Sequence, residues 1–99
     1  MIVTVFRSRL KPEARTAYDP MAAHMSELAR AMPGYISHKV FTADDGERVT
    51  IVEFESEETH NAWGQHPEHR AAKMQGRAEF YSDYKLQVCD VKRQSKMPT

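Results

Sequence analysis

Turn-forming residues divide this chain into short segments, and this division limits the folds that it can adopt. The breaks fall at Lys11-Pro12, Pro33-Gly34, Asp44-Asp45-Gly46, His66-Pro67 and Gly76. Proline fixes φ and lacks an N–H, while glycine and Asp-Gly accept a positive φ, so such positions end helices and strands or connect them. Because the chain has only 99 residues, the segments between these breaks have to share one small domain.

Four of the segments have the composition and the alternation of β-strands. Residues 1–10 are rich in Val, Ile, Thr and Phe, which favour strands. Residues 35–42 and 48–55 form a predicted hairpin around the Asp44-Asp45-Gly46 turn, and residues 80–91 form the last predicted strand. Apolar side chains fall on both faces of several of these strands, so we expect both faces of the sheet to be covered.

One helix is predicted from a stripe of apolar side chains spaced by three and four residues. The stripe consists of Tyr18, Met21, Met25, Leu28 and Met32. Inside a helix Pro20 would cost about 3 kcal/mol, but in the first turn it costs little. We therefore expect the regular helix to start near residues 17–19, with Asp19 as a cap, and to end at Pro33-Gly34.

A second helical region is expected to be broken into two pieces. Ser56 is a favourable cap, and the two glutamates that follow it place negative charge at the positive end of the helix dipole. His66-Pro67 interrupts the region, and Pro67 suits the first position of a new helix. We expect this second piece to run to about residue 75 and to stop at Gly76.

The resulting order is strand, helix, strand, strand, broken helix, strand, which is the βαββαβ order of the ferredoxin-like fold. It predicts an α+β domain over residues 1–93, with a four-stranded antiparallel sheet and helices on one face. Residues 94–99 are expected to form a polar tail. The second face of the sheet then needs a cover, and we expect a homodimer to provide it.

Charge and composition argue against several classes of protein. Lys plus Arg and Asp plus Glu each total 14, so the formal net charge is zero, which disfavours binding to nucleic acid or to an acidic membrane surface. No apolar run approaches the roughly 20 residues of a membrane span, and the N-terminal residues alternate too early for a signal peptide. The one cysteine, Cys89, cannot form an internal disulfide, and we expect a cytoplasmic protein in which it is a small buried side chain.

Five stretches spread over nearly the whole chain are also similar to one known family. They are residues 3–7 (VTVFR), 29–35 (ARAMPGY), 52–56 (VEFES), Trp63 followed by 66–69 (HPEH), and 80–84 (FYSDY). They resemble the antibiotic biosynthesis monooxygenase (ABM) domain family, and this resemblance implies a dimeric α+β barrel built from two ferredoxin-like subunits. Some members of that family are cofactor-independent oxygenases that convert phenolic polycyclic substrates to quinones, whereas others bind and degrade haem.

The resemblance implies a candidate reaction, the oxidation of a flat phenolic or quinol compound by O2 without metal or flavin. Dioxygen is a triplet that reacts slowly with closed-shell molecules, so the substrate has to act as the electron donor, and deprotonation raises its donor strength. Trp63 is the candidate to orient the substrate, through ring stacking and its indole N–H. His38, His66 and His69 are the candidates for the base, because imidazole exchanges protons near neutral pH.

Five further side chains are candidates for binding the substrate. They are Arg7, Arg77, Phe80, Tyr84 and Met25. An arginine can hold an anion, and the aromatic and methionine side chains can form an adaptable apolar wall. Each candidate also has a structural alternative: Arg7 can pair with a carboxylate, Trp63 can be a core anchor, and His66 can cap the helix that follows it.

Two other functions are open at this level: a non-catalytic dimeric module that binds a small apolar metabolite, and haem binding or breakdown. The haem-degrading branch has an axial histidine about ten residues beyond the tryptophan, where this chain has Lys73, so either His69 substitutes with a changed geometry or the chain is not a haem enzyme. His60, His66 and His69 lack a firm metal-ligand spacing, and the chain has no Gly-x-Gly-x-x-Gly, phosphate-loop or Gly-x-Ser-x-Gly motif. We therefore expect no metal, no cofactor, and a small aromatic or apolar metabolite as the ligand.

Overall fold

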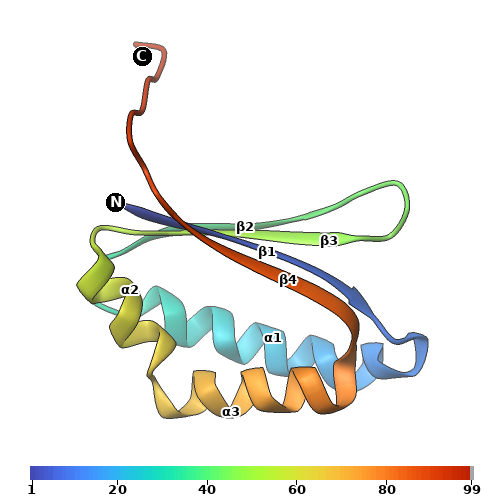
Figure 1. Cartoon of the computed structure of the whole chain (residues 1–99). Coiled ribbons are helices and arrows are strands. Elements are labelled where there is room, and N and C mark those ends of the chain that lie inside the picture. Colours follow the sequence, from blue (N-terminus) through green and yellow to red (C-terminus); the bar gives the residue numbers. More distant parts are fainter. Residues whose placement is uncertain (99) are drawn as a thin grey trace.

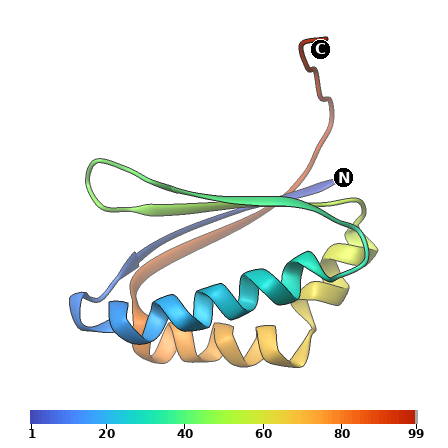
Figure 2. The same cartoon turned by 180° about the vertical axis from the view of Figure 1, so that it is seen from behind.

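The computed structural model describes residues 1–98 of the chain. In chain order, its elements are β1 (Ile2–Leu10), η1 (Pro12–Ala14), α1 (Arg15–Arg30), β2 (Tyr35–Thr42), β3 (Arg48–Phe54), α2 (Glu57–Gly64), α3 (Pro67–Gln75), η2 (Gly76–Phe80) and β4 (Tyr81–Asp90). The strands form one antiparallel sheet in the order β2-β3-β1-β4. The helices all lie on one face of this sheet (Figure 1), and the view from behind in Figure 2 shows the same two layers. This is the ferredoxin-like α+β fold that the sequence predicts.

The two ends of the chain lie near each other at one end of the sheet. The N–H of Val91 donates to the carbonyl of Met1 at 3.0 Å, directly after β4. From there to residue 98 the chain forms no further helix or strand, and Figure 1 shows it leading away from the sheet. Thr99, the last residue of the expected tail, lies outside the described residues. Within residues 1–98, no helix is long and apolar enough to cross a membrane.

The first helix begins earlier than the sequence predicts. One 3-10 turn, η1, has Pro12 at its first position and leads directly into α1, whose cap is Ala14 rather than Asp19. Pro20 therefore lies inside the helix, where it cannot donate to the carbonyl of Thr16. Because Thr16 and Pro20 are both exposed, water can bond to this carbonyl, and the expected start near residues 17–19 is wrong.

The second helical region is broken as predicted, but it ends differently. Ser56 caps α2 in a reciprocal capping box with Thr59, and Pro67 occupies the first turn of α3. Gly76 does not stop the helix, because the chain continues through one π-helical turn, η2, before β4. A Cβ at Gly76 would meet the ring of Tyr81 at 2.5 Å, so this glycine serves close packing instead.

The inner face of the sheet, toward the helices, carries the core. Ile2, Thr4 and Ser8 of β1 are buried on this face, and Phe54 of β3 is fully buried. The largest cluster on this face joins Phe54 to Ala29 of α1 and Trp63 of α2. A second cluster, formed by Ala14, Tyr18 and Phe80, closes the other end of the helix layer. These clusters hold the helices against the two ends of the sheet.

The outer face of the sheet has no helix over it (Figure 1). The apolar side chains of Val3, Val5 and Ile51 share this face and are half-buried. Cys89 is opposite Val3 on the same face and is exposed, so the expectation of a buried cysteine is wrong for the single chain. The reason is that β4 is an edge strand, and none of the described elements covers its outer face.

Candidate functional site

A cavity of about 440 Å³ lies between the helices and the inner face of the sheet. Side chains of all three α-helices and all four strands contribute to its wall. Six of the side chains singled out from the sequence line it: Met25, His38, Trp63, His69, Arg77 and Tyr84. The cavity volume falls within the range of about 300–1,000 Å³ that is usual for sites of small ligands.

The other three candidates lie elsewhere. Arg7 is on the outer face and makes two hydrogen bonds, at 3.0 and 2.8 Å, to the carboxylate of Glu47. Phe80 is buried in the core and packs edge-on against Tyr18. His66 caps α3, where its Nδ1 accepts a hydrogen bond from a backbone N–H. Each of these three side chains therefore has a structural role, and the polar groups of the cavity come from other residues.

Trp63 and His69 form a stacked pair in the wall of the cavity. Their ring centroids are 4.1 Å apart and the planes are inclined by only 9°. The Nδ1 of His69 lies 3.0 Å from the carbonyl oxygen of Trp63. Because a carbonyl can only accept, Nδ1 carries the proton in the neutral ring, and Nε2 is left to accept a hydrogen bond.

The environment of His69 keeps the imidazole neutral. Burial against Trp63 disfavours the charged ring and lowers the pKa of His69 to about 4, although its hydrogen bond to the Trp63 carbonyl acts in the opposite direction. Positive charge on Lys73 lowers the pKa further. At neutral pH, His69 therefore presents an uncharged acceptor to the cavity.

His38 belongs to a hydrogen-bonded chain that links β2 to α1. Its Nδ1 is 2.7 Å from the hydroxyl of Tyr35, and its Nε2 is 3.1 Å from the hydroxyl of Ser26. Both His38 and Ser26 line the cavity. Burial, with a smaller contribution from the charge of Arg30, lowers the pKa of His38 below its ordinary value. Ser26 can therefore pass a proton between the cavity and a neutral imidazole.

A third histidine, His60, lines the cavity from α2. Its ring meets the ring of Phe54 edge-on, with centroids 6.0 Å apart. Its Nδ1 is buried and has no hydrogen-bond partner within residues 1–98. A buried polar nitrogen without a partner is costly, so a ligand group that bonds to it would gain affinity.

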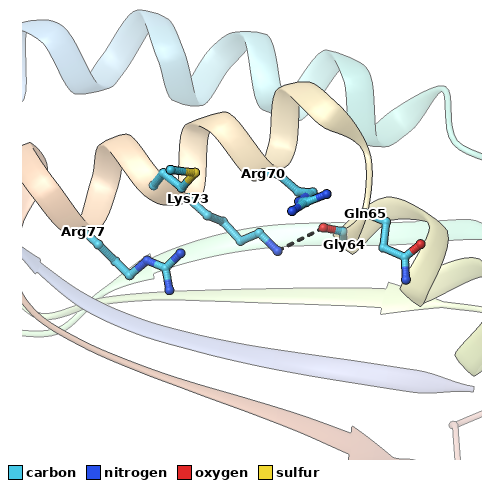
Figure 3. Close-up of a pocket in the computed structure, with 6 residues that line it drawn as sticks. Gly64, Gln65, Arg70, Lys73 and Arg77 are labelled. Atoms are coloured by element: carbon cyan, nitrogen blue, oxygen red, sulfur yellow. Dashed lines mark hydrogen bonds between the residues drawn. The ribbon is translucent and has the colours of Figure 1, made fainter.

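Basic side chains form one rim of the cavity, which Figure 3 shows in close-up. Arg70, Lys73 and Arg77 project from α3 and η2, Lys73 toward Gly64 at the end of α2, and they line a smaller hollow of about 180 Å³. Lys73 donates a hydrogen bond of 3.0 Å to the carbonyl of Gly64. Burial, and then the charges of the two arginines, lower the pKa of Lys73 below its ordinary value.

The metal-ion alternative gains no suitable set of ligands among residues 1–98. Lys73 stands where the haem-degrading branch has its axial histidine, and its amine is directed to the Gly64 carbonyl. Among the described residues, no group of three or more His, Cys, Asp or Glu side chains is placed to hold a metal ion. His66 and His69 make separate hydrogen bonds to the backbone.

Comparison with known proteins places the chain in a family. A family model described as antibiotic biosynthesis monooxygenase matches residues 1–75, from β1 to the end of α3. The chain belongs to the antibiotic biosynthesis monooxygenase family. It is also 36% identical over 90 residues to the uncharacterized protein YqjZ of Bacillus subtilis (strain 168), an overlap that spans 91% of this chain and 79% of that protein.

Solved structures share the ABM fold. Rv0793 from Mycobacterium tuberculosis has a TM-score of 0.84 and 19% identity, over 96% of this chain and 98% of that chain. SnoaB, a cofactor-independent oxygenase from Streptomyces nogalater, has a TM-score of 0.77 and 15% identity, over 94% of both chains. At such low identity these structures show that the fold is the same, and they leave the reaction of this ABM protein to be argued from its own cavity.

Several residues of this ABM cavity were not singled out from the sequence as substrate-binding or catalytic. They are Tyr18, Ser26, Arg48, His60, Lys73 and Tyr81. Arg48 lies over the ring of Tyr18, 5.1 Å from its centroid, in the wall of the cavity. Periodicity could have identified two of them. His60 is one helical turn before Trp63, and Arg48 has the same parity along β3 as the inward-facing Phe54, so it lies on the same face.

Proposed function

We propose that this ABM protein is an oxygenase that oxidises a small, electron-rich phenol or hydroquinone with O2, without metal or flavin. The observation that carries the proposal is the cavity of about 440 Å³ in which Trp63 stacks on His69. Family membership supports the reaction class, and the volume and the aromatic wall support a flat ligand. The resemblance of SnoaB in fold supports chemistry of the same kind.

The reaction balances without a further reagent. A phenol and O2 give a quinone and water: one oxygen atom becomes the new carbonyl oxygen, and the other leaves as water with the ring hydrogen and the phenolic proton. The substrate supplies all four electrons. The first electron passes to O2 and gives superoxide, which then combines with the phenoxyl radical to form a C–O bond. Loss of water breaks the O–O bond and leaves the quinone.

The neutral histidines suit the first step of this reaction. Loss of an electron makes a phenolic O–H much more acidic, so an acceptor with a low pKa is sufficient to take the proton as the electron leaves. In the proposal, Nε2 of His69 accepts the phenolic hydrogen bond, and Ser26 with His38 provides a second path for the proton. Trp63 orients the ring by stacking.

Oxygen consumption tests the proposal directly. Purified protein, freed of metal with a chelator, is mixed with a panel of hydroquinones, naphthols and anthrones in an oxygen electrode. We expect uptake above the rate of autoxidation, with one atom of labelled O2 in the quinones formed from naphthols and anthrones, and H2O2 without label in the quinone from simple hydroquinones. The variant His69→Gln should lower the rate about 100-fold. His24→Gln is the matched control, because His24 pairs with Glu68 on the surface and does not line the cavity.

The second candidate is a binding module that holds an apolar metabolite without changing it. It is favoured by the partners of the two histidines: His38 bonds to hydroxyl groups and His69 bonds to a backbone carbonyl, and neither has a carboxylate to strengthen it as a base. A panel member that binds in the cavity and is recovered unchanged after hours under O2 would favour this candidate. Absence of uptake with every member of the panel would defeat the oxygenase.

We also propose that the protein is a homodimer formed through the outer face of the sheet. The half-buried Val3, Val5 and Ile51 and the exposed Cys89 lie together there, and no element within residues 1–98 covers them. Pairing of two such faces would bury this surface. Cys89 is a free thiol, which is best suited to a reducing compartment such as the cytoplasm.

A further inference from the structure

The basic rim of the cavity is built from one face of a helix. Arg70, Lys73 and Arg77 are spaced by three and four residues, so their side chains project in the same direction, as Figure 3 shows. They line the hollow of about 180 Å³ beside the end of α2. Lys73 and Arg77 also line the main cavity, as does Gly64, the neighbour of Trp63. The hollow and the main cavity are therefore parts of one site.

The positive charge of this rim is not compensated. Within the described part of the chain, none of the ion pairs includes Arg70, Lys73 or Arg77. The acidic residues nearest in sequence have other partners, since Glu68 pairs with His24 of α1 and Glu79 accepts a hydrogen bond from Gln75. Like charges at this spacing on a helix repel one another. The rim therefore concentrates positive charge, although the formal net charge of the chain is zero. Three unpaired cations beside an apolar cavity are the arrangement expected for binding an anion.

We propose that this basic rim binds an acidic group of the substrate, so that the substrate is a phenol or hydroquinone that carries a carboxylate. The inference rests on the proposed function and names its substrate class. The guanidinium groups of Arg70 and Arg77 can each bind a carboxylate through two N–H donors, whereas Lys73 is already held by the Gly64 carbonyl. With the acid at the rim, the aromatic ring extends past Gly64 toward Trp63 and His69.

Binding without turnover tests this inference. Under anaerobic conditions, calorimetry compares 6-hydroxy-2-naphthoate with its methyl ester, which has the same ring but no charge. We expect the acid to bind at least about tenfold more tightly than the ester at low salt, and this preference to shrink as ionic strength rises. The double variant Arg70→Gln, Arg77→Gln should lose the preference while still binding the ester, which also shows that its cavity is intact. The double variant Lys92→Gln, Arg93→Gln, in the exposed chain after β4, is the charge-matched control and should keep the preference.

Three outcomes would overturn the inference. The first is that the acid and the ester bind equally well. The second is that the double variant keeps the preference for the acid. The third is that inorganic phosphate alone competes as strongly as the acid, which would make the rim a site for a free anion. Oxygen uptake from uncharged hydroquinones is measured separately, so the oxygenase can stand when the acid preference fails. Conversely, a preference for the acid without any oxygen uptake would leave the anion site in place and remove the reaction.

Discussion

The histidine beside Trp63 gives the fold a specific dependence on pH. In the folded chain, burial holds the pKa of His69 at about 4, whereas in the unfolded chain it returns to the ordinary 6.5. Between these values the unfolded chain binds more protons, so stability rises with pH from about 4 to 6.5 and is lost as pH falls through the same window. At about 1.4 kcal/mol per pKa unit the full shift is worth about 3 kcal/mol, and partial exposure of the ring reduces this to about 2 kcal/mol.

Urea unfolding at several pH values measures this effect. Trp63 is the only tryptophan, so its fluorescence reports the unfolding of the region that contains His69. We expect His69→Gln to be less stable than the wild type at pH 7, because the stacked ring is lost, and to lose about 2 kcal/mol less between pH 7 and pH 4.5. His24→Gln measures the effect of removing a surface histidine. If the wild type and His69→Gln lose the same free energy over this interval, the reasoning about His69 is wrong.

Three further predictions concern the core, the turns and the outer face. Phe54→Ala should lower the free energy of unfolding by about 4 kcal/mol, because this ring is fully buried; a loss below about 2 kcal/mol in urea would contradict that packing. Gly34→Ala should lower the free energy of unfolding more than Gly46→Ala does. Both glycines have a positive φ, of 81° and 90°, which costs an alanine about 1–2 kcal/mol, but only at Gly34 would the new Cβ also collide with Thr59. Equal losses in urea would refute this difference. Sedimentation should give the mass of two chains for the wild type and of one chain for Ile51→Lys; a wild-type monomer would end the dimer proposal.

Much of the fold could be predicted because its signals are local. The Ser56 cap, the break at His66-Pro67 and the turn at Gly46 each depend on the backbone of a few neighbouring residues. The strand order then follows from the sequence of elements and the rules of short connections. Such features need no knowledge of what packs against them, and the structure has each one where the sequence predicts it.

The errors occurred where tertiary contacts decide. Pro20 is tolerated inside α1 because it lies on the exposed side of the helix, and Gly76 is required by the ring of Tyr81 rather than by a helix end. The cavity was equally hard to assign from the sequence. Arg7 points to the outer face with Glu47, while Arg77, on a different element, lies at the rim. Alternation gives the two faces of a strand, but only packing shows which polar groups of distant elements meet.

One local feature nevertheless explains the geometry of the site. In a continuous helix, the carbonyl of Trp63 would accept the N–H of residue 67, four positions later, but Pro67 has no N–H to give. The carbonyl instead accepts the N–H of His66 at 3.1 Å, and its second lone pair accepts Nδ1–H of His69 at 3.0 Å. That bond fixes the tautomer, brings the imidazole flat against the indole, and leaves Nε2 as the acceptor in a ring that lines the cavity.

The next carbonyl along the chain follows the same logic. Gly64 would receive the N–H of Glu68 in a continuous helix, but that N–H donates to Nδ1 of His66 at the new helix start. Lys73 takes its place and donates to the Gly64 carbonyl at 3.0 Å, which positions the middle cation of the basic rim. The break at Pro67 thus places both the neutral acceptor and the bound cation at the end of α2. A flat acid that reaches from the basic rim to His69 would contact both groups that this break positions.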